Sequence, residues 1–395
     1  MTGGGELSEV SAERMLAMAR EFAPIAAGRA AEMEIARCAP PEIVDGLREL
    51  GVFRMHVPRR YGGLELGVPA SLPILEELAA ADGAVGWTAM IGSHAGMLAA
   101  RLPAATLDEV YAKSPDTIWA CSLVPGGTAE VIPGGYRVSG RWPFASGCQH
   151  ADWIYGFCLV TENGKPVASQ TGHPPLRAVA LPASRWTIED TWAAEGLKGT
   201  GSHHVSLAQV DVQSANTFPI FEGAPIVPGP LYENPLAILP LHFGAIAVGL
   251  AEGALRDIAD LAKSGKRYSF AAEALKDSPV FHHEVGKTQA QVIAARALLH
   301  AVADRQWAMA AAGPTDAMAA VEMGQAMAWI AQTCADAVGK CYSLGGSSVV
   351  YDASPLQRRL RDIHAVTQHT TLNPRFFAFA GEVLAGHPAR HPMGG

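Results

Sequence analysis

The 395-residue sequence lacks the features that mark several large classes of protein. Only 17% of its residues are charged, and the formal net charge is −8. It has no lysine and arginine cluster of the kind that neutralises nucleic-acid phosphates. Its six cysteines form no C-x-x-C pair, and its start lacks the basic and apolar regions of a signal peptide. We therefore expect reduced thiols, a cytoplasmic location and no nucleic-acid partner.

Long hydrophobic runs and nucleotide-binding loops are also missing. The longest apolar stretch, Leu236 to Leu250, is interrupted by Pro240 and His242, which predicts a buried helix and no membrane span. No G-x-G-x-x-G loop follows a first strand, so we expect no Rossmann domain for NAD(P)H. The adjacent pairs His203-His204 and His282-His283 point apart on a strand or helix, and we predict no metal site.

The sequence does contain a helical, then β, then helical order. Met15, Met18 and Phe22 share one helix face, and Pro40-Pro41 begins a helix over 42–50 that Gly51 ends. Further helices are predicted over 72–80 and 85–101. A hairpin at Gly134-Gly135 and strands over 153–160, 177–181 and 205–212 predict a small antiparallel barrel or sandwich.

The C-terminal part returns to helical patterning. The runs 289–312 and 317–338 are apolar on more than one side, which is typical of a bundle that also builds an oligomer interface. We predict an α+β protein with an N-terminal helical domain (1–115), a middle antiparallel β domain (116–225) and a C-terminal helical bundle (226–395).

Two segments, Arg141 to His150 and Arg361 to His369, contain the hydroxyl and imidazole side chains that are candidates for catalysis. Other motifs are distributed along nearly the whole chain. These are Leu50-Gly51-Val52-Phe53 with Pro58 and Tyr61-Gly62-Gly63; Glu76 to Asp82 with Gly86-Trp87; Gly196 to Ser202; Arg267-Tyr268-Ser269-Phe270; and Leu344-Gly345-Gly346 with Arg361-Asp362. Together they resemble the acyl-CoA dehydrogenase superfamily, which implies an acyl-CoA dehydrogenase-like fold.

The same resemblance distinguishes two chemistries. A dehydrogenase needs a carboxylate base to remove a proton from its thioester substrate. The positions where the family carries that base hold Thr370 and Pro240 here, and the stretch 363–374 contains no Asp or Glu. Gln368-His369 stands there instead. This pattern resembles the oxygen-using branch, the group D oxygenase components of two-component flavin-dependent monooxygenases.

The resemblance assigns catalytic roles to Ser146, His369 and His94. Ser146 resembles the hydroxyl that bonds the flavin N5 and stabilises a C4a-hydroperoxyflavin. His369 and His94 would orient the substrate, and an imidazole suits this role because its pKa lies near neutrality. Each residue also has a purely structural alternative. Ser146 would be a strand-end serine bonded to backbone, His369 a core histidine and His94 a surface helix histidine.

The remaining predicted site residues bind flavin or substrate. Cofactor-binding roles are implied for Ser146, Phe144, Trp87, Arg267, Gly345, Gly346 and Gln368. Arg267 would clamp flavin phosphate across a subunit boundary, the alternative being a solvated Lys/Arg cluster. Cys121 would face the substrate beside His94 and His369, with no nucleophilic role.

The resemblance therefore implies an enzyme that hydroxylates a small phenolic or indolic substrate with O2 and reduced FMN or FADH2. A separate flavin reductase would supply the reduced flavin, and a homotetramer is expected. The alternatives are an acyl-CoA dehydrogenase and a non-catalytic flavin-binding relative. The substrate, the oxygenated atom (C, N or S), FMN against FAD and the reductase stay open.

Overall fold

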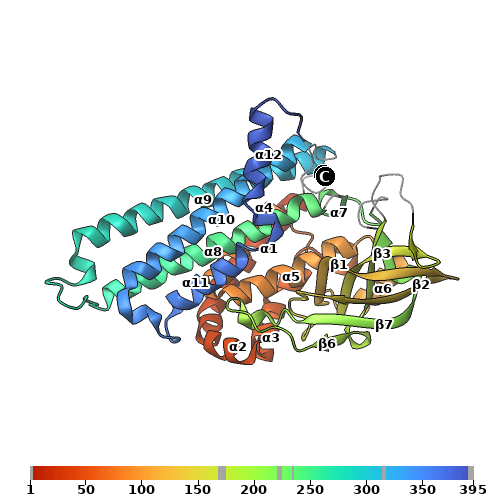
Figure 1. Ribbon diagram of the computed structural model, residues 1–395, viewed down its shortest axis with the longest axis horizontal. Coiled ribbons are helices and arrows are strands. Elements are labelled where there is room, and N and C mark those ends of the chain that lie inside the picture. The colour runs from red at the N-terminus through yellow and green to blue at the C-terminus, as the bar shows by residue number, and fades with distance from the viewer. Residues whose placement is uncertain (1–2, 168–174, 220–224, 234, 314–316, 390–395) are drawn as a thin grey trace.

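The computed structural model describes residues 3–167, 175–219, 225–233, 235–313 and 317–389. Helices form the two ends of the described chain and one sheet forms its middle (Figure 1). The N-terminal helices are α1 (Gly3–Gly28), α2 (Ala30–Ala36), α3 (Pro41–Leu50), α4 (Val68–Ala81), α5 (Gly83–Ala99) and α6 (Ala104–Tyr111). The predicted order of helical, β and helical parts is confirmed; the borders between the three domains stay predictions.

Local signals explain where several of these helices begin and end. Pro41 is the first residue of α3, and Gly51 ends it with a φ of 88°, a left-handed conformation that glycine adopts without strain. Asp82 caps α5, because its side chain accepts hydrogen bonds from the backbone N–H groups of Ala84 and Val85. The predicted helices at 42–50, 72–80 and 85–101 are thus confirmed, with shifted ends for the last two.

The middle of the chain forms a sheet of eight strands among the described residues. They are β1 (Trp119–Ile132), β2 (Gly135–Trp142), β3 (Trp153–Glu162), β4 (Lys165–Pro166), β5 (Leu176–Pro182), β6 (Thr187–Glu189), β7 (His204–Gln213) and β8 (Thr217–Pro219). The order is β6-β7-β2-β1-β3-β5-β8, with β4 paired to β3. The prediction of a wholly antiparallel domain is wrong in one respect, since β1 and β3 pair in parallel.

A buried tryptophan holds the end of β2, from which the chain enters the site. The Trp142 indole N–H donates to the carbonyl oxygen of Phe157 at 2.7 Å. Glycines make room for the indole ring: a Cβ on Gly127 would lie 2.2 Å from it and one on Gly156 2.8 Å. Any larger residue at these positions would displace Trp142 and, with it, the turn that follows β2.

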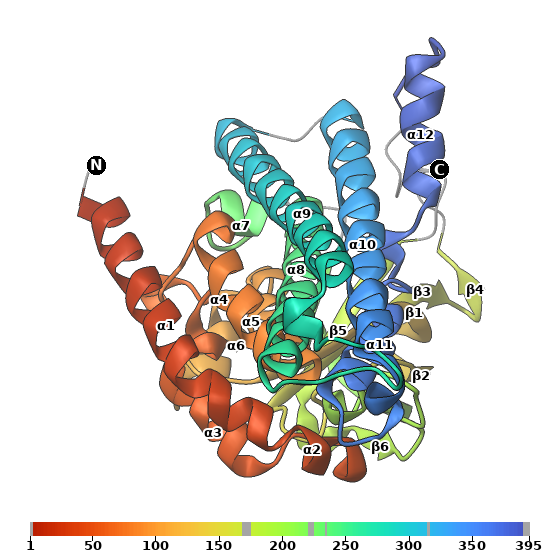
Figure 2. The same cartoon turned by 90° about the vertical axis from the view of Figure 1, so that its left-hand side faces the viewer.

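The C-terminal helices are α7 (Pro230–Glu233), α8 (Pro235–Lys263), α9 (Pro279–Ala312), α10 (Ala317–Gly345), α11 (Pro355–Val366) and α12 (Arg375–Leu384). In Figure 2, α9 and α10 lie side by side with α8 behind them. α8 is long and apolar enough to cross a membrane, but 89% of its most apolar stretch is buried inside the protein. It is therefore the core helix of the bundle, as its interruption by Pro240 and His242 predicted.

Candidate active site

Ser146 lies in a buried turn between the sheet and the helices. The turn is built by two residues with positive φ, Phe144 at 61° and Gly147 at 74°. It is fastened by the Gly147 N–H, which donates to the carbonyl oxygen of Thr200 at 2.9 Å. The prediction that Ser146 ends a strand is corrected, because β2 ends at Trp142. Phe144 is 61% exposed, so it is no core residue.

The Ser146 hydroxyl belongs to a chain of hydrogen bonds. The Trp87 indole N–H donates to Ser146 Oγ at 3.1 Å. Ser146 Oγ lies 2.6 Å from Ser202 Oγ, which lies 2.7 Å from Thr200 Oγ1. Thr200 Oγ1 in turn donates to the carbonyl oxygen of Leu197 at 2.8 Å. The simple alternative of a serine bonded only to backbone is therefore wrong.

Trp87, His94 and His369 gather around one aromatic ring, that of Phe243 on α8. The His369 ring stacks on it with centroids 3.9 Å apart. The His94 and Trp87 rings lie 5.7 and 5.4 Å from it, and Trp87 lies 5.9 Å from His369. The structure thus brings together, from α5, α8 and the segment after α11, side chains that the sequence had singled out separately.

His369 is not on a helix, as the sequence had suggested. α11 ends at Val366, and His369 precedes a single 3-10 turn, Thr370–Leu372. Its Nδ1 accepts a hydrogen bond from the Thr371 backbone N–H at 3.4 Å and lies 2.8 Å from Thr371 Oγ1. The neighbouring Gln368 is exposed. These contacts orient the His369 ring toward Phe243.

A row of buried imidazoles continues from His94, and sequence analysis did not find it. His94 stacks on His242 at 5.9 Å, and His242 stacks on His56 at 5.0 Å. His94 is buried, so it is not a surface helix histidine. The one available signal was His242 itself, a polar residue in the otherwise apolar run 236–250.

Burial changes the protonation expected for these rings. It lowers the pKa of His94 to about 3 and those of His369 and His56 to about 4. The imidazoles are therefore neutral at pH 7, and the expectation of a pKa near neutrality is corrected. A neutral imidazole offers one N–H donor and one lone pair, so His94 and His369 can both bind and orient a substrate hydroxyl or N–H group.

The surroundings of Ser146 fit a polar ligand of flavin type. Thr88 Oγ1, His94 Nδ1 and Ser122 Oγ are buried without a hydrogen-bond partner among the described residues. Such atoms are costly unless a ligand or water satisfies them. Thr88 and His94 lie on the same helix, α5, as Trp87, and Ser122 lies on β1, which packs against α5. A flat, polar ring system placed against this face would supply the missing partners.

Cys121 lies beside Ser122 on β1, and its thiol is buried. Burial raises the pKa of Cys121 to about 11, so the thiol stays protonated at pH 7. This agrees with the expectation that Cys121 does not act as a nucleophile; its place beside the substrate stays a prediction. Among the described residues, no group of three or more His, Cys, Asp or Glu side chains is placed to hold a metal ion.

The predicted flavin-binding residues Arg267, Gly345 and Gly346 lie together at the end of the helical bundle that is far from the sheet. The loop between α8 and α9 carries Arg267, and Figure 1 places this loop far from the sheet. The Tyr268 hydroxyl in this loop donates to the Leu344 carbonyl at 2.6 Å, beside Gly345 and Gly346. Arg267 is exposed. Within one chain, the structure therefore separates Arg267, Gly345 and Gly346 from Ser146.

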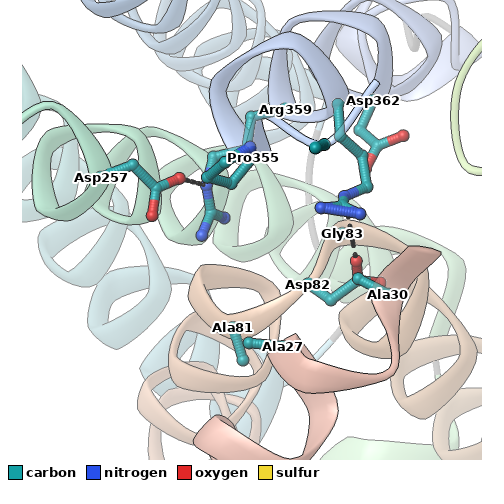
Figure 3. Close-up of a pocket in the computed structure, with 11 residues that line it drawn as sticks. Ala27, Ala30, Ala81, Asp82, Gly83, Asp257, Pro355, Arg359 and Asp362 are labelled. Carbon is teal, nitrogen blue, oxygen red and sulfur yellow. Dashed lines mark hydrogen bonds and ion pairs between the residues drawn. The ribbon is translucent and has the colours of Figure 1, made fainter. Parts of the chain in front are cut away.

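A cavity of about 290 Å³ lies where α11 meets α5 (Figure 3), and it is distinct from the aromatic group around Phe243. Asp82, Arg358, Arg359 and Asp362 line it with Asp257. Asp362 Oδ1 accepts a hydrogen bond from the Leu197 backbone N–H at 2.6 Å. Burial, and next the charge of Asp82, raise the pKa of Asp362 to about 7. Asp362 thus anchors the loop that carries Thr200 and Ser202.

The positions of a dehydrogenase base carry no carboxylate in the folded chain. Thr370 begins the 3-10 turn after His369, and Pro240 lies inside α8. The place of the base is taken by uncharged imidazoles and aromatic rings. This arrangement can bind and orient an aromatic substrate, but among its described residues it offers no carboxylate to accept the α-proton of a thioester.

Comparisons with known proteins agree with the motifs. Residues 10–106 match the model "Acyl-CoA dehydrogenase, N-terminal domain", and residues 241–374 match "Acyl-CoA dehydrogenase, C-terminal domain". The chain is 33% identical over 362 residues to an indole-3-acetate monooxygenase of Pseudomonas putida, covering 91% of this chain and 90% of that protein. It is 29% identical to the flavin-dependent monooxygenase oxygenase subunit HsaA of Mycobacterium tuberculosis, covering 98% and 99%.

The fold is also that of a solved relative. XiaF from Streptomyces, whose structure holds FADH2 and glycerol, superposes with a TM-score of 0.90 at 24% identity, covering 98% of each chain. At that identity the likeness concerns the fold. The sequence matches to the two monooxygenases above cover 91% and 98% of this chain.

Proposed function

Since this chain belongs to the acyl-CoA dehydrogenase family, in its flavin-dependent monooxygenase branch, we propose that it hydroxylates a small phenolic or indolic substrate as an oxygenase component. It is an oxidoreductase that uses reduced flavin and O2. The observation that carries the choice of substrate class is the group of Trp87, His94 and His369 around Phe243, which has aromatic surfaces and neutral hydrogen-bonding nitrogens but no carboxylate base.

Reduced FMN or FADH2, when bound, would supply the two electrons that activate O2, and O2 would supply the oxygen atom that is transferred. Ser146 would hold the flavin N5 from the turn after β2, and Trp87 would support it through its indole N–H. Phe144 and Gln368, both exposed in the single chain, would contact the flavin from the outer side. Burial of the surrounding hydroxyls keeps bulk water away from the reacting atoms.

His94 and His369 would bind the polar group of the substrate. Both rings are uncharged at pH 7, so each has one N–H and one lone pair. The lone pair of His369 Nδ1 is used by the Thr371 N–H, so its Nε2–H would donate to a phenol oxygen. His94 Nδ1, which has no partner among the described residues, could accept from a phenol O–H or an indole N–H. Stacking on Phe243 fixes the His369 plane at a centroid distance of 3.9 Å. The substrate ring would then be held by two rigid imidazoles, which favours one orientation toward the flavin.

Three further parts of the proposal concern partners and location. Reduced flavin would come from a separate reductase, as the name "oxygenase subunit" of HsaA implies for that protein. Arg267 of a neighbouring subunit would bind the flavin phosphate, since the loop between α8 and α9, which carries Arg267, lies far from the sheet within one chain (Figure 1). A homotetramer in the cytoplasm is supported by this separation and by six free cysteines.

The test is a titration of the purified protein with reduced FMN and FADH2, followed by O2 and by candidate phenols and indoles. We expect tight binding of reduced flavin and, after O2 is added, hydroxylated product in an amount limited by the bound reduced flavin. Sustained turnover from NAD(P)H should require an added reductase. Rapid NADH oxidation by the isolated chain would contradict the proposal. Reduction of bound FAD by an acyl-CoA would identify a dehydrogenase instead, and absence of flavin binding would identify a non-catalytic relative.

A further inference from the structure

The chain of hydroxyls at Ser146 has a direction, and its far end sets it. The Leu197 carbonyl oxygen can only accept, and Thr200 Oγ1 donates to it at 2.8 Å. A hydroxyl carries one proton and two lone pairs. Once the proton of Thr200 is used on Leu197, its oxygen can only accept from Ser202, 2.7 Å away.

The same count continues to Ser146. Ser202 has spent its proton on Thr200, so the contact of 2.6 Å between Ser202 and Ser146 is donated by Ser146. Ser146 Oγ also accepts the Trp87 indole N–H at 3.1 Å. Ser146 is then left with one free lone pair and no free proton.

The chain is sheltered from water and held by its backbone. Ser146, Thr200 and Ser202 are 4%, 2% and 4% exposed, so solvent hydroxyls do not compete for these bonds. Leu197 begins the turn with a φ of 53°, and Asp362 fixes its N–H at 2.6 Å. The direction of donation, from Ser146 to Ser202 to Thr200 to the Leu197 carbonyl, is therefore fixed by the folded structure.

We propose that Ser202 and Thr200 are positioning residues that make Ser146 a hydrogen-bond acceptor toward the flavin, so that the site selects reduced over oxidised flavin. This inference rests on the proposed function. Reduced flavin carries a hydrogen on N5 and can donate it to the free lone pair of Ser146. Oxidised flavin has a bare lone pair on N5, which faces the lone pair of Ser146 and finds no donor. The consequence is release of oxidised flavin after each turnover.

The test compares dissociation constants for reduced and oxidised flavin, measured anaerobically by flavin fluorescence with the same FMN or FAD. In Ser202→Ala, Ser146 keeps its proton and can donate it to oxidised flavin. We expect the ratio of oxidised to reduced dissociation constants to fall roughly tenfold, the effect of about one hydrogen bond. Thr200→Val should lower the ratio in the same direction, and Thr200→Ser, which retains the hydroxyl, should restore it.

A matched control and a double-mutant cycle make the test specific. Ser139→Ala removes a hydroxyl that only accepts from the Gln209 N–H on the same sheet, and it should leave the ratio unchanged. In a Ser146→Ala background, Ser202→Ala should have no further effect on the ratio.

An unchanged ratio in both Ser202→Ala and Thr200→Val would overturn the proposed direction of the hydrogen bonds. The same drop with and without Ser146 would also overturn it. Hydroxylation by the unmodified protein with a reductase would leave the proposed function standing. Failure to bind either form of flavin would overturn both.

Discussion

At the scale of single residues, the site is controlled by what burial does to ionisable groups. Burial lowers the pKa of His94 and His369, so these imidazoles lose their charge, and no ion pair with a carboxylate is recorded for them in the described part of the chain. Neutral rings suit a reaction in which the flavin and O2 supply the chemistry and the protein supplies orientation. Mutation of His369 tests this orienting role most directly.

We expect His369→Ala to lose product formation by about 10²- to 10⁴-fold while still binding reduced flavin, because an orienting or proton-handling group is typically worth this much. Consumption of O2 should continue and yield hydrogen peroxide. Coupled hydroxylation and melting temperature are measured on one preparation. His364→Ala, at an exposed position on α11, is the matched control and should behave like the unmodified protein. Full specific activity in a destabilised His369→Ala protein would show that the ring is only structural.

Asp362 links stability to pH. Its pKa is raised to about 7 by burial and by Asp82, whereas in an unfolded chain an aspartate titrates near 3.9. The folded state therefore binds the proton more tightly. The stabilisation is fully present below about pH 4 and is lost as the pH rises through about 7. The unfolding free energy should fall between these values.

Asp362→Asn should remove this fall in the unfolding free energy, which is on the order of 2 kcal/mol between pH 5 and 8, because asparagine does not titrate. The amide oxygen of asparagine can still accept from the Leu197 N–H, so the contact with the loop is kept. Urea unfolding at both pH values measures the fall. Asp260→Asn, whose side chain is 73% exposed, should leave the slope as it was. Equal slopes in all three proteins would show that Asp362 is already ionised in the folded state at low pH.

At the scale of elements, capping signals were enough to predict several helices. Pro41 and Gly51 fix both ends of α3 by local backbone preference alone. The parallel pairing of β1 with β3 was missed because it joins Trp119 to Trp153, which are separated in the sequence by strand β2. The pairing also has register shifts between Ser122 and Gly127. Pairings of that kind depend on the packing of the whole sheet and leave no local pattern.

The candidate site was predictable to the same limited extent. Ser146, His94 and His369 were found because they stand in motifs, but their arrangement around Phe243 was not. The direction of the hydroxyl chain depends on atoms of Ser202 that approach Ser146 only in the folded chain. Sequence resemblance names such residues, whereas distances decide what their protons do.

The loop between α8 and α9 makes its own prediction. Tyr268 ties it to the end of α10, while Arg267 is exposed and forms no ion pair within the described part of the chain. We expect Arg267→Ala to raise the dissociation constant for flavin roughly 10- to 100-fold, the loss of charge-assisted hydrogen bonds to phosphate, with an unchanged melting temperature. Lys263→Ala, which removes an exposed cation paired with Asp260, is the control. An unaltered dissociation constant would assign Arg267 to a solvated surface.

At the scale of the whole molecule, the question is whether one chain can build one complete flavin site. Ser146 follows β2 of the sheet, and the loop between α8 and α9, which carries Arg267, lies at the end of the bundle far from the sheet (Figure 1). Large apolar side chains on the bundle remain exposed in the single chain, among them Ile293 on α9 at 59% and Trp329 on α10 at 40%. Exposed apolar residues of this kind are typical of surfaces that pack against another subunit.

This arrangement predicts complementation between two impaired variants. Ser146→Ala and Arg267→Ala subunits, coexpressed with different affinity tags and purified through both, should form mixed oligomers. If each site takes Ser146 from one chain and Arg267 from another, some sites in the mixture carry both unmodified residues and others carry neither. Hydroxylation coupled to a reductase should then exceed that of either parent, and tight flavin binding should return for a fraction of the sites. Sedimentation at micromolar concentration should show no monomer. If both residues serve a site within one chain, every site keeps one defect, and the mixed oligomers should perform no better than the average of the two parents.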